Sequence, residues 1–216
     1  MKKGLIITQK FGVLTAAFIH LTAFETVSSD KLNEANPLKM AFHTKNILIM
    51  DISFKSIILF GSIILTGLSA GLFYAWSVSV IPGTKGVADL TYLKTMQSIN
   101  RAILNPAFFL VFFGSIVLLS ISSIYEFHTN KWVFTLMLAA SITYLIGTVG
   151  ITALGNVPLN DQLEVLKIAE TRADKISEFR KYYESNWNRL HLIRTVFAVL
   201  SFLLAVLALF IQTKKI

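Results

Sequence analysis

The segment Gly155 to Asp161 carries the side chains best suited to chemistry in this chain. It contains two asparagines and an aspartate, and it directly follows a long uncharged apolar run. Amide and carboxylate groups at the end of a run of membrane length cost free energy unless they bind something or are hydrogen-bonded by the protein. We therefore expect a binding site here or a set of satisfied polar contacts. The proline of this segment, Pro158, is expected to break the helix.

Two other segments carry polar side chains next to an apolar run. One reads as a helix over 90–105 before the second run, and the other precedes the last run. Within each segment the main polar residues are three or four apart, so they share one helical face. The first segment holds Gln97, Asn100, Arg101 and Asn105, and the second holds Trp187, Asn188, His191 and Arg194, with Asn100 and Asn188 beside these faces.

The composition indicates a small membrane protein. Hydrophobic residues make up 54% of 216 residues, and the mean hydropathy is +0.64, which is too apolar for an ordinary soluble domain. The net charge of +8 is concentrated between apolar runs and at the chain ends, which is typical of contact with lipid headgroups. We expect an integral protein of a bacterial cytoplasmic membrane and no nucleic-acid partner. The absence of cysteine excludes disulfides, iron–sulfur clusters and cysteine-based zinc sites.

The apolar runs predict four transmembrane helices. Each run is long enough to cross a hydrocarbon core of about 30 Å at about 1.5 Å per residue. Residues 51–216 are expected to form the membrane domain, and residues 1–50 an extension or leader outside the core fold. The predicted spans are about 56–81, 106–124, 132–154 and 195–211, with the first ended by Pro82 and Gly83.

Small residues within the spans predict close helix packing. Gly67, Gly71 and Ala75 recur at four-residue spacing in the first span, and Gly147 and Gly150 lie near the end of the third. Such faces let the backbones of two helices approach closely. They could also support a homo-oligomer.

The longest charged stretch, 159–187, has the period of an amphipathic helix. Its apolar residues are spaced three or four apart, which predicts a helix lying along the membrane surface or covering the end of the bundle. These residues are Leu159, Leu163, Leu166, Ala169, Ala173, Ile176, Phe179 and Tyr183.

Short connections between four spans require an up-and-down arrangement. Connections one and three then lie on one side of the membrane, so the three polar segments converge at one end. The predicted fold is an all-α, four-helix up-and-down transmembrane bundle with an added amphipathic helix between spans three and four. Ionisable side chains that face the interior of such a bundle are candidates for function. We expect a site between the helices at this end.

The three polar segments also resemble a known family. Residues 96–106, 155–161 and 187–195, in this order, are similar to the anthrone oxygenase-like family of small four-span membrane proteins, and the resemblance covers about residues 55 to 212. It implies oxidation of an anthrone methylene to a quinone carbonyl with dioxygen and without a cofactor. A deprotonated anthrone can itself supply electrons to dioxygen, so the protein needs a base, donors for the anion and an apolar pocket.

The resemblance also implies roles for individual residues. His191 or Asp161 would be the base, and Arg101 and Arg194 would stabilise the anion. The residues expected to bind or orient the substrate are Gln97, Asn100, Asn105, Asn156, Asn160, Trp187 and Asn188, with the phenylalanines of the second span as further walls. The expected partners are a hydrophobic small molecule and the lipid bilayer, and no metal is expected.

Other interpretations of the same residues stay open. The protein could be a non-enzymatic membrane protein that binds a lipid or quinone, or a structural or assembly factor. Asn156, Asn160 and Asp161 could cap helices, and Arg101 or Arg194 could pair with Asp161. A metal site is not favoured because the histidines at 20, 43, 128 and 191 do not gather in one place.

Overall fold

The computed structural model describes residues 54–213, and these residues form helices without a strand. The predicted extension over residues 1–50 lies outside them. The helices are α3 (Phe54–Ala75), η2 (Trp76–Val80), α4 (Ile81–Thr84), α5 (Asp89–Ala102), α6 (Pro106–Glu126), α7 (Lys131–Thr143), η3 (Tyr144–Gly150), η4 (Thr152–Asn156), α8 (Val157–Val165), η5 (Ile168–Glu170) and α9 (Ala173–Thr213). The elements η2, η3 and η4 are π-helical, and η5 is a 3₁₀ turn.

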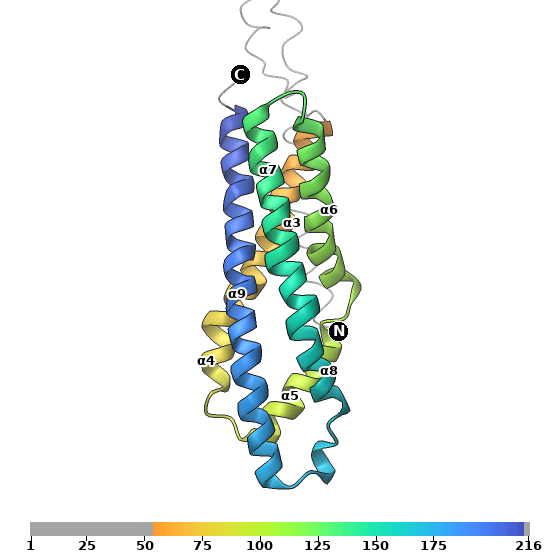
Figure 1. The fold of residues 1–216 in the computed structure, drawn as a ribbon, viewed down its shortest axis with the longest axis vertical. Helices are drawn as coiled ribbons and strands as arrows, with labels where there is room; N and C mark the ends of the chain where they lie inside the picture. The colour runs from red at the N-terminus through yellow and green to blue at the C-terminus, as the bar shows by residue number, and fades with distance from the viewer. Residues whose placement is uncertain (1–53, 214–216) are drawn as a thin grey trace, which may run out of the picture. The chain divides into compact units, whose positions relative to one another are not determined.

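Four continuous helical rods are long and apolar enough to cross a membrane, which confirms the predicted all-α four-helix bundle. They are Phe54–Thr84, Pro106–Glu126, Lys131–Val165 and Ala173–Thr213. In the bundle α3 packs on α6 and α9, and α7 packs on the same two helices. The connections after the first and third rods lie at one end, with α5 beside them, and the α6–α7 connection lies at the other (Figure 1). Four apolar helices in this arrangement indicate an integral membrane protein.

The two prolines inside the rods do not end the helices where the sequence suggested. Pro82 follows the π-helical turn η2, and Pro158 follows η4, and each occupies the second position of the α-helical segment after that turn. A π turn shifts the hydrogen-bond register by one residue. Proline has no backbone N–H, and the first positions of the next helical segment do not require one, so a proline is tolerated there. The helices therefore continue to Thr84 and Val165, and the segment around Pro158 lies inside a helix.

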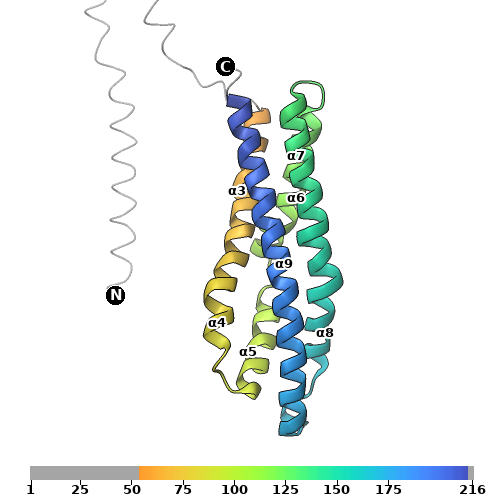
Figure 2. The ribbon, with the colours of Figure 1, turned by 60° about the vertical axis from the view of Figure 1, so that its left-hand side comes forward.

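The amphipathic stretch 159–187 is divided between two helices. Its first part completes α8, residues 166–172 turn the chain, and its second part begins α9. The 41 residues of α9 are about 60 Å long, about twice the hydrocarbon thickness, so its first half extends beyond the core. The apolar stripe covers the end of the bundle and packs on α5, in a cluster of Tyr92, Leu93, Met96, Leu159, Leu163, Ile168, Ile176, Tyr183 and Trp187. Figure 2 shows α5 and α8 on either side of this part of α9.

Arg180 ties this end of α9 to the connection that follows the first rod. Its guanidinium forms ion pairs with Asp89 at 2.8 Å and Glu184 at 3.0 Å, and it lies 4.5 Å from the centre of the Tyr92 ring. It also donates to the main-chain carbonyls of Thr84, Lys85 and Val87. The first of these carbonyls ends the first rod and the other two lie in the loop after it, so one side chain of α9 sets the position of the loop leading into α5.

Two of the predicted glycine contacts are present. A Cβ at Gly147 would lie 2.0 Å from Cγ of Phe197 on α9, and a Cβ at Gly67 would lie 3.0 Å from Cε2 of Phe202. Gly71 has nothing within 4 Å, and near Gly150 the only contact is a carbonyl of its own helix. The close approach of the third rod to α9 therefore depends on Gly147.

This difference predicts opposite results for two matched substitutions. Gly147→Ala places a methyl group against the root of the Phe197 ring, which cannot swing away, and should destabilise the protein by about 1–3 kcal/mol. Gly71→Ala meets open space and should not destabilise it. Thermal unfolding in detergent compares the two variants, and equal unfolding temperatures would contradict the packing described here.

Asp89 should make stability depend on acid pH. Hydrogen bonds from Ser177 and Arg180 hold the pKa of the Asp89 carboxyl below its ordinary value. A lowered folded-state pKa adds stability that is complete above the ordinary range, about pH 4, and is lost as pH falls through the lower value. Asp89→Asn should flatten the dependence of unfolding temperature on pH below about pH 4. Asp174→Asn, which removes an exposed carboxylate paired with Arg172 at the start of α9, is the control for the loss of a surface carboxylate elsewhere.

Candidate functional site

A cavity of about 470 Å³ opens between the helices at the end where the polar segments converge. Each of the four rods and α5 contribute to its wall. The lining residues are Leu72, Phe73 and Trp76; Ile99, Asn100, Arg101, Ile103 and Leu104; Phe108, Phe109, Phe112 and Phe113; Val149, Thr152, Ala153, Val157, Asn160, Asp161 and Glu164; and Trp187, His191 and Arg194. Most of these side chains are apolar, so the cavity suits a hydrophobic molecule.

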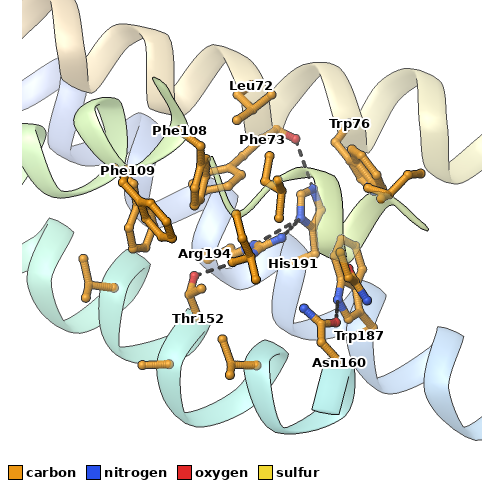
Figure 3. A pocket seen from close by; sticks show the side chains of 18 of the residues that line it. Leu72, Phe73, Trp76, Phe108, Phe109, Thr152, Asn160, Trp187, His191 and Arg194 are labelled. Carbon is orange, nitrogen blue, oxygen red and sulfur yellow. Dashed lines mark hydrogen bonds between the residues drawn. The ribbon is translucent and has the colours of Figure 1, made fainter. Parts of the chain in front are cut away.

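Aromatic rings form much of the wall (Figure 3). The phenylalanines of α6 follow one another at the start of that helix, as the sequence suggested for the second span. Phe108 stacks on Phe112 with ring centres 5.2 Å apart and an interplanar angle of 20°. Trp76 and Trp187 meet on another side with ring centres 5.8 Å apart. Flat apolar faces of this kind fit a flat aromatic ligand.

Arg194 is the buried cation of the cavity, with only 8% of its surface exposed. Its Nε and Nη2 atoms donate to Nδ1 of His191 at 3.2 and 2.9 Å, and Nη1 donates to Oγ1 of Thr152 at 3.3 Å. The guanidinium carbon lies 4.7 Å from the ring centre of Phe73 and 5.0 Å from that of Trp187. No carboxylate of residues 54–213 lies within ion-pair distance of it.

His191 is buried beside Arg194 and has both ring nitrogens occupied. Nδ1 accepts from Arg194, and because a guanidinium only donates, Nδ1 must carry a lone pair. The ring proton is then on Nε2, which lies 3.1 Å from the carbonyl oxygen of Phe73 and 3.1 Å from Oγ of Ser77. The ring stacks on Trp187 with centres 5.0 Å apart and planes 8° apart. His191 therefore has no free nitrogen facing the cavity.

Asn160 links α8 to α9 and keeps a donor for the cavity. Its Oδ1 atom accepts from the hydroxyl of Tyr183 at 3.0 Å and from Nε1 of Trp187 at 2.9 Å. Asn100 donates to the same tyrosine hydroxyl at 3.3 Å. The amide nitrogen of Asn160 has no partner within residues 54–213 and lies on the side away from Trp187 (Figure 3).

A row of polar side chains on the third rod meets α9 next to the cavity. Thr148 donates to the carbonyl of Arg194, Thr152 accepts from its guanidinium, and Asn156 donates to the carbonyl of Trp187. With Asn160 the row has a strict four-residue spacing, which places it on one face. The buried Oδ1 atom of Asn156 has no partner in the described part of the chain. This row fixes the rotation of α9, and therefore the direction in which its cavity residues point.

An ion pair and a second carboxylate lie at the exposed rim of the cavity. Arg101 binds Glu164 at 2.8 Å, and their side chains are 64% and 46% exposed. The hydrogen bond and charge of Glu164 raise the pKa of the Arg101 guanidinium above its ordinary value. Asp161 lines the cavity, is exposed, and makes no ion pair or hydrogen bond within residues 54–213. The charge of Arg101 is thus already balanced, whereas that of Arg194 is not.

The cavity includes most of the predicted residues. Arg101, Asn100, Asn160, Asp161, Trp187, His191 and Arg194 line it. The remaining four predicted residues do not: Gln97 donates to the carbonyls of Leu163 and Leu166, Asn105 caps α6 by accepting from the Phe108 N–H, Asn156 is buried beside α9, and Asn188 is not part of the wall.

Helix capping by Asn156 or Asn160 and pairing of an arginine with Asp161 are not what the structure shows. Asn156 makes no side-chain cap at the start of α8, because the helix does not begin there but continues from η4. Asn160 bonds to α9 instead of to a helix end. Neither Arg101 nor Arg194 pairs with Asp161, since the first has Glu164 and the second has no carboxylate partner within residues 54–213.

Several residues of the site were not found from the sequence. Thr152 could have been found from its four-residue spacing to Asn156, and Tyr183 from its place on the stripe one turn before Trp187. No pattern in the sequence marks Glu164 or the Phe73 carbonyl, because their roles depend on the orientation of each helical rod about its own axis. Residues 54–213 contain no group of three or more histidine, cysteine or acidic residues that could hold a metal ion.

Comparison with known proteins gives one family. The sequence model of the anthrone oxygenase family matches residues 108–204, which include α6, the third rod and the part of α9 that carries His191 and Arg194. No curated protein and no solved structure matches the chain. The family match supports the assignment of this chain to an anthrone oxygenase-like family.

Proposed function

We propose that the protein is a membrane oxygenase that oxidises a hydrophobic anthrone-type or phenolic molecule with dioxygen and without a cofactor. The observation that carries this proposal is the buried guanidinium of Arg194, which faces an aromatic cavity and has no carboxylate to balance it within residues 54–213. The family match supplies the type of reaction.

The charge of Arg194 favours a ligand with a negative charge. An unbalanced buried cation costs several kcal/mol, and proteins keep such groups mainly where they have a function. Arg194 carries five N–H groups, of which three are used by His191 and Thr152, so two are left for a ligand. The free amide nitrogen of Asn160 adds another donor. A flat aromatic ligand that carries an oxyanion would place its oxygen against the charge of Arg194 and its rings against the aromatic walls of the cavity.

The proposed reaction needs only substrate and dioxygen. Loss of a proton from the anthrone methylene gives an anion whose charge is mostly on oxygen, where Arg194 would hold it. This anion gives one electron to dioxygen, and the resulting radical and superoxide join to form a carbon–oxygen bond. The peroxide takes up a proton, then loses water with the second hydrogen of the same carbon. One oxygen atom ends in the quinone carbonyl and the other in water, and all four electrons come from the substrate.

Asp161 is the proposed base. Two carboxylates line the cavity, and Glu164 is held by Arg101, which leaves Asp161 without a partner among residues 54–213. His191, the other candidate from the sequence, has its Nδ1 lone pair engaged by Arg194 and its Nε2 directed to the Phe73 carbonyl. A proton added to Nδ1 would displace the guanidinium and place two cations side by side, which is unfavourable in an apolar cavity.

The rival proposal is a membrane protein that binds an anionic lipid or a quinone without converting it. The same cavity and cation would serve it. Oxygen uptake separates the two: purified protein in lipid nanodiscs with 1,8-dihydroxyanthrone should consume dioxygen faster than protein-free nanodiscs and form the anthraquinone. Binding of the anthrone without such uptake would support the rival. We also propose that the protein lies in the bacterial cytoplasmic membrane, and fractionation of expressing cells checks this location.

Substitution of Arg194 should separate function from stability. Arg194→Met removes the cation that holds the oxyanion, so kcat/KM should fall by about 10²–10³-fold. Because no carboxylate of residues 54–213 balances the charge, the unfolding temperature should fall little, by no more than the loss of the hydrogen bonds to His191 and Thr152 explains.

Two other arginines are the matched controls. Arg189→Met changes an exposed residue of the same helix and should leave kcat/KM unchanged. Arg101→Met removes a charge already paired with Glu164 and should cost less than about 10-fold. If Arg194→Met kept full activity, or lost activity only because it unfolded, Arg194 would not be the anion site.

Asp161→Asn should slow turnover in a way that depends on pH. The variant cannot take the proton from the substrate, so kcat near neutral pH should fall by about 10²–10⁴-fold. As the pH rises toward the acidity of the substrate itself, the substrate ionises in solution and the difference from the wild type should shrink. Rates of anthraquinone formation across this pH range test the assignment, with Glu164→Gln as a control. A deficit that stays constant with pH would show that Asp161 is not the base.

A further inference from the structure

The contacts of His191 suggest a task different from proton transfer. Within residues 54–213 it is the side chain that fixes the Nε and Nη2 edge of Arg194, since the other bond of the guanidinium goes from Nη1 to Thr152. Both residues lie on α9, three positions apart, so the acceptor stands one turn before the cation that it holds. The ring is 1% exposed.

The ring is itself held from three directions. Nε2 meets the carbonyl of Phe73 and the hydroxyl of Ser77, both on the first rod. One face stacks on Trp187, and the ring centre of Phe73 lies 6.0 Å from that of the imidazole with the two planes at 86°. Thr195 adds a contact to Nε2 at 3.4 Å. Rotation of the imidazole would break all of these contacts, so its tautomer and its orientation are fixed together.

We propose that His191 is a positioning residue: a neutral Nε2–H imidazole whose Nδ1 lone pair aims the guanidinium of Arg194, so that the two unused N–H groups of Arg194 meet the oxyanion of the ligand. This inference rests on the proposed function in that the ligand is an anion. Figure 3 shows the order of the parts, with the Phe73 carbonyl above the imidazole and Arg194 between the imidazole and Thr152. A guanidinium held on one edge needs no reorientation when the ligand binds.

Two substitutions distinguish a positioning residue from a base. The Oδ1 atom of asparagine can take the place of Nδ1 and accept from Arg194, but the amide does not accept a proton. Phenylalanine keeps an aromatic ring that can stack on Trp187 and meet Phe73 edge to face, but it has no acceptor. His191→Asn should therefore retain activity within about 10-fold of the wild type, and His191→Phe should lose about 10²-fold or more. His128→Asn, at an exposed position at the opposite end of the bundle, is the control.

The experiment also needs a readout independent of turnover. 1,8-Dihydroxyanthraquinone changes colour when a phenol group ionises, so its absorbance reports whether it is bound as an anion. Wild type and His191→Asn should bind it as the anion at neutral pH, and His191→Phe should bind it neutral or more weakly. Unfolding temperatures of all variants establish that they are folded. The acid side of the pH–rate profile should be the same in wild type and His191→Asn.

Three results would overturn the proposal. One is full activity and anion binding in His191→Phe, and another is an inactive His191→Asn that still binds the coloured anion, which would make His191 the base. The third is an acid limb of the pH–rate profile that disappears in His191→Asn. If the wild type binds the dye as an anion but takes up no dioxygen, the oxygenase proposal fails, whereas the dye binding of the His191 variants still decides the role of His191.

Discussion

The placement of Arg194 is the constraint on which the site end of this protein depends. Its guanidinium is enclosed by aromatic rings, held by an imidazole and a hydroxyl, and balanced by no carboxylate within residues 54–213. In a membrane protein this arrangement is costly, and the surrounding structure compensates for it only in part. Each neighbouring rod contributes to that compensation: the first through the Phe73 carbonyl and Ser77 by way of His191, the third through Thr152, and α9 through Trp187.

The helical geometry makes this placement possible. π-helical turns lie in the first and third rods next to the cavity, and η2 and η4 are each followed by an α-helical segment with a proline at its second position. Such turns are common at functional sites, because they change the direction in which side chains point. On the third rod they bring Thr152 and Asn160 toward α9. Gly147 lets the two rods approach, since any side chain there would meet the ring of Phe197.

The fold could be predicted well from the sequence, because runs of apolar residues and short connections leave few arrangements. The convergence of Arg101, Asp161 and Arg194 on one cavity also follows from topology. What could not be predicted is how neighbouring helices rotate. Periodicity alone does not show that Arg101 takes Glu164 as its partner, that Gln97 and Asn105 satisfy main-chain groups, or that His191 uses both nitrogens.

The continuation of the helix through Pro158 has a related cause. Proline is a strong signal for a helix end, but a π turn depends on contacts with other helices, which the local sequence does not contain. The amphipathic stretch 159–187 shows the same limit. Its apolar stripe continues through the turn at 166–172, because α8 before the turn and the start of α9 after it both pack into one cluster with α5. The period of the stripe therefore does not reveal that the chain reverses direction there.

The central claim is that the cavity favours an anion because of an unbalanced buried cation. The most direct measurement is the pH at which 1,8-dihydroxyanthraquinone ionises when it is bound to the wild-type protein in lipid nanodiscs, compared with the same dye in nanodiscs without protein. The bound dye should ionise at a clearly lower pH than the free dye, because Arg194 stabilises its anion. Ionisation at the same pH or at a higher pH would contradict it, since an apolar cavity without an available cation would favour the neutral dye.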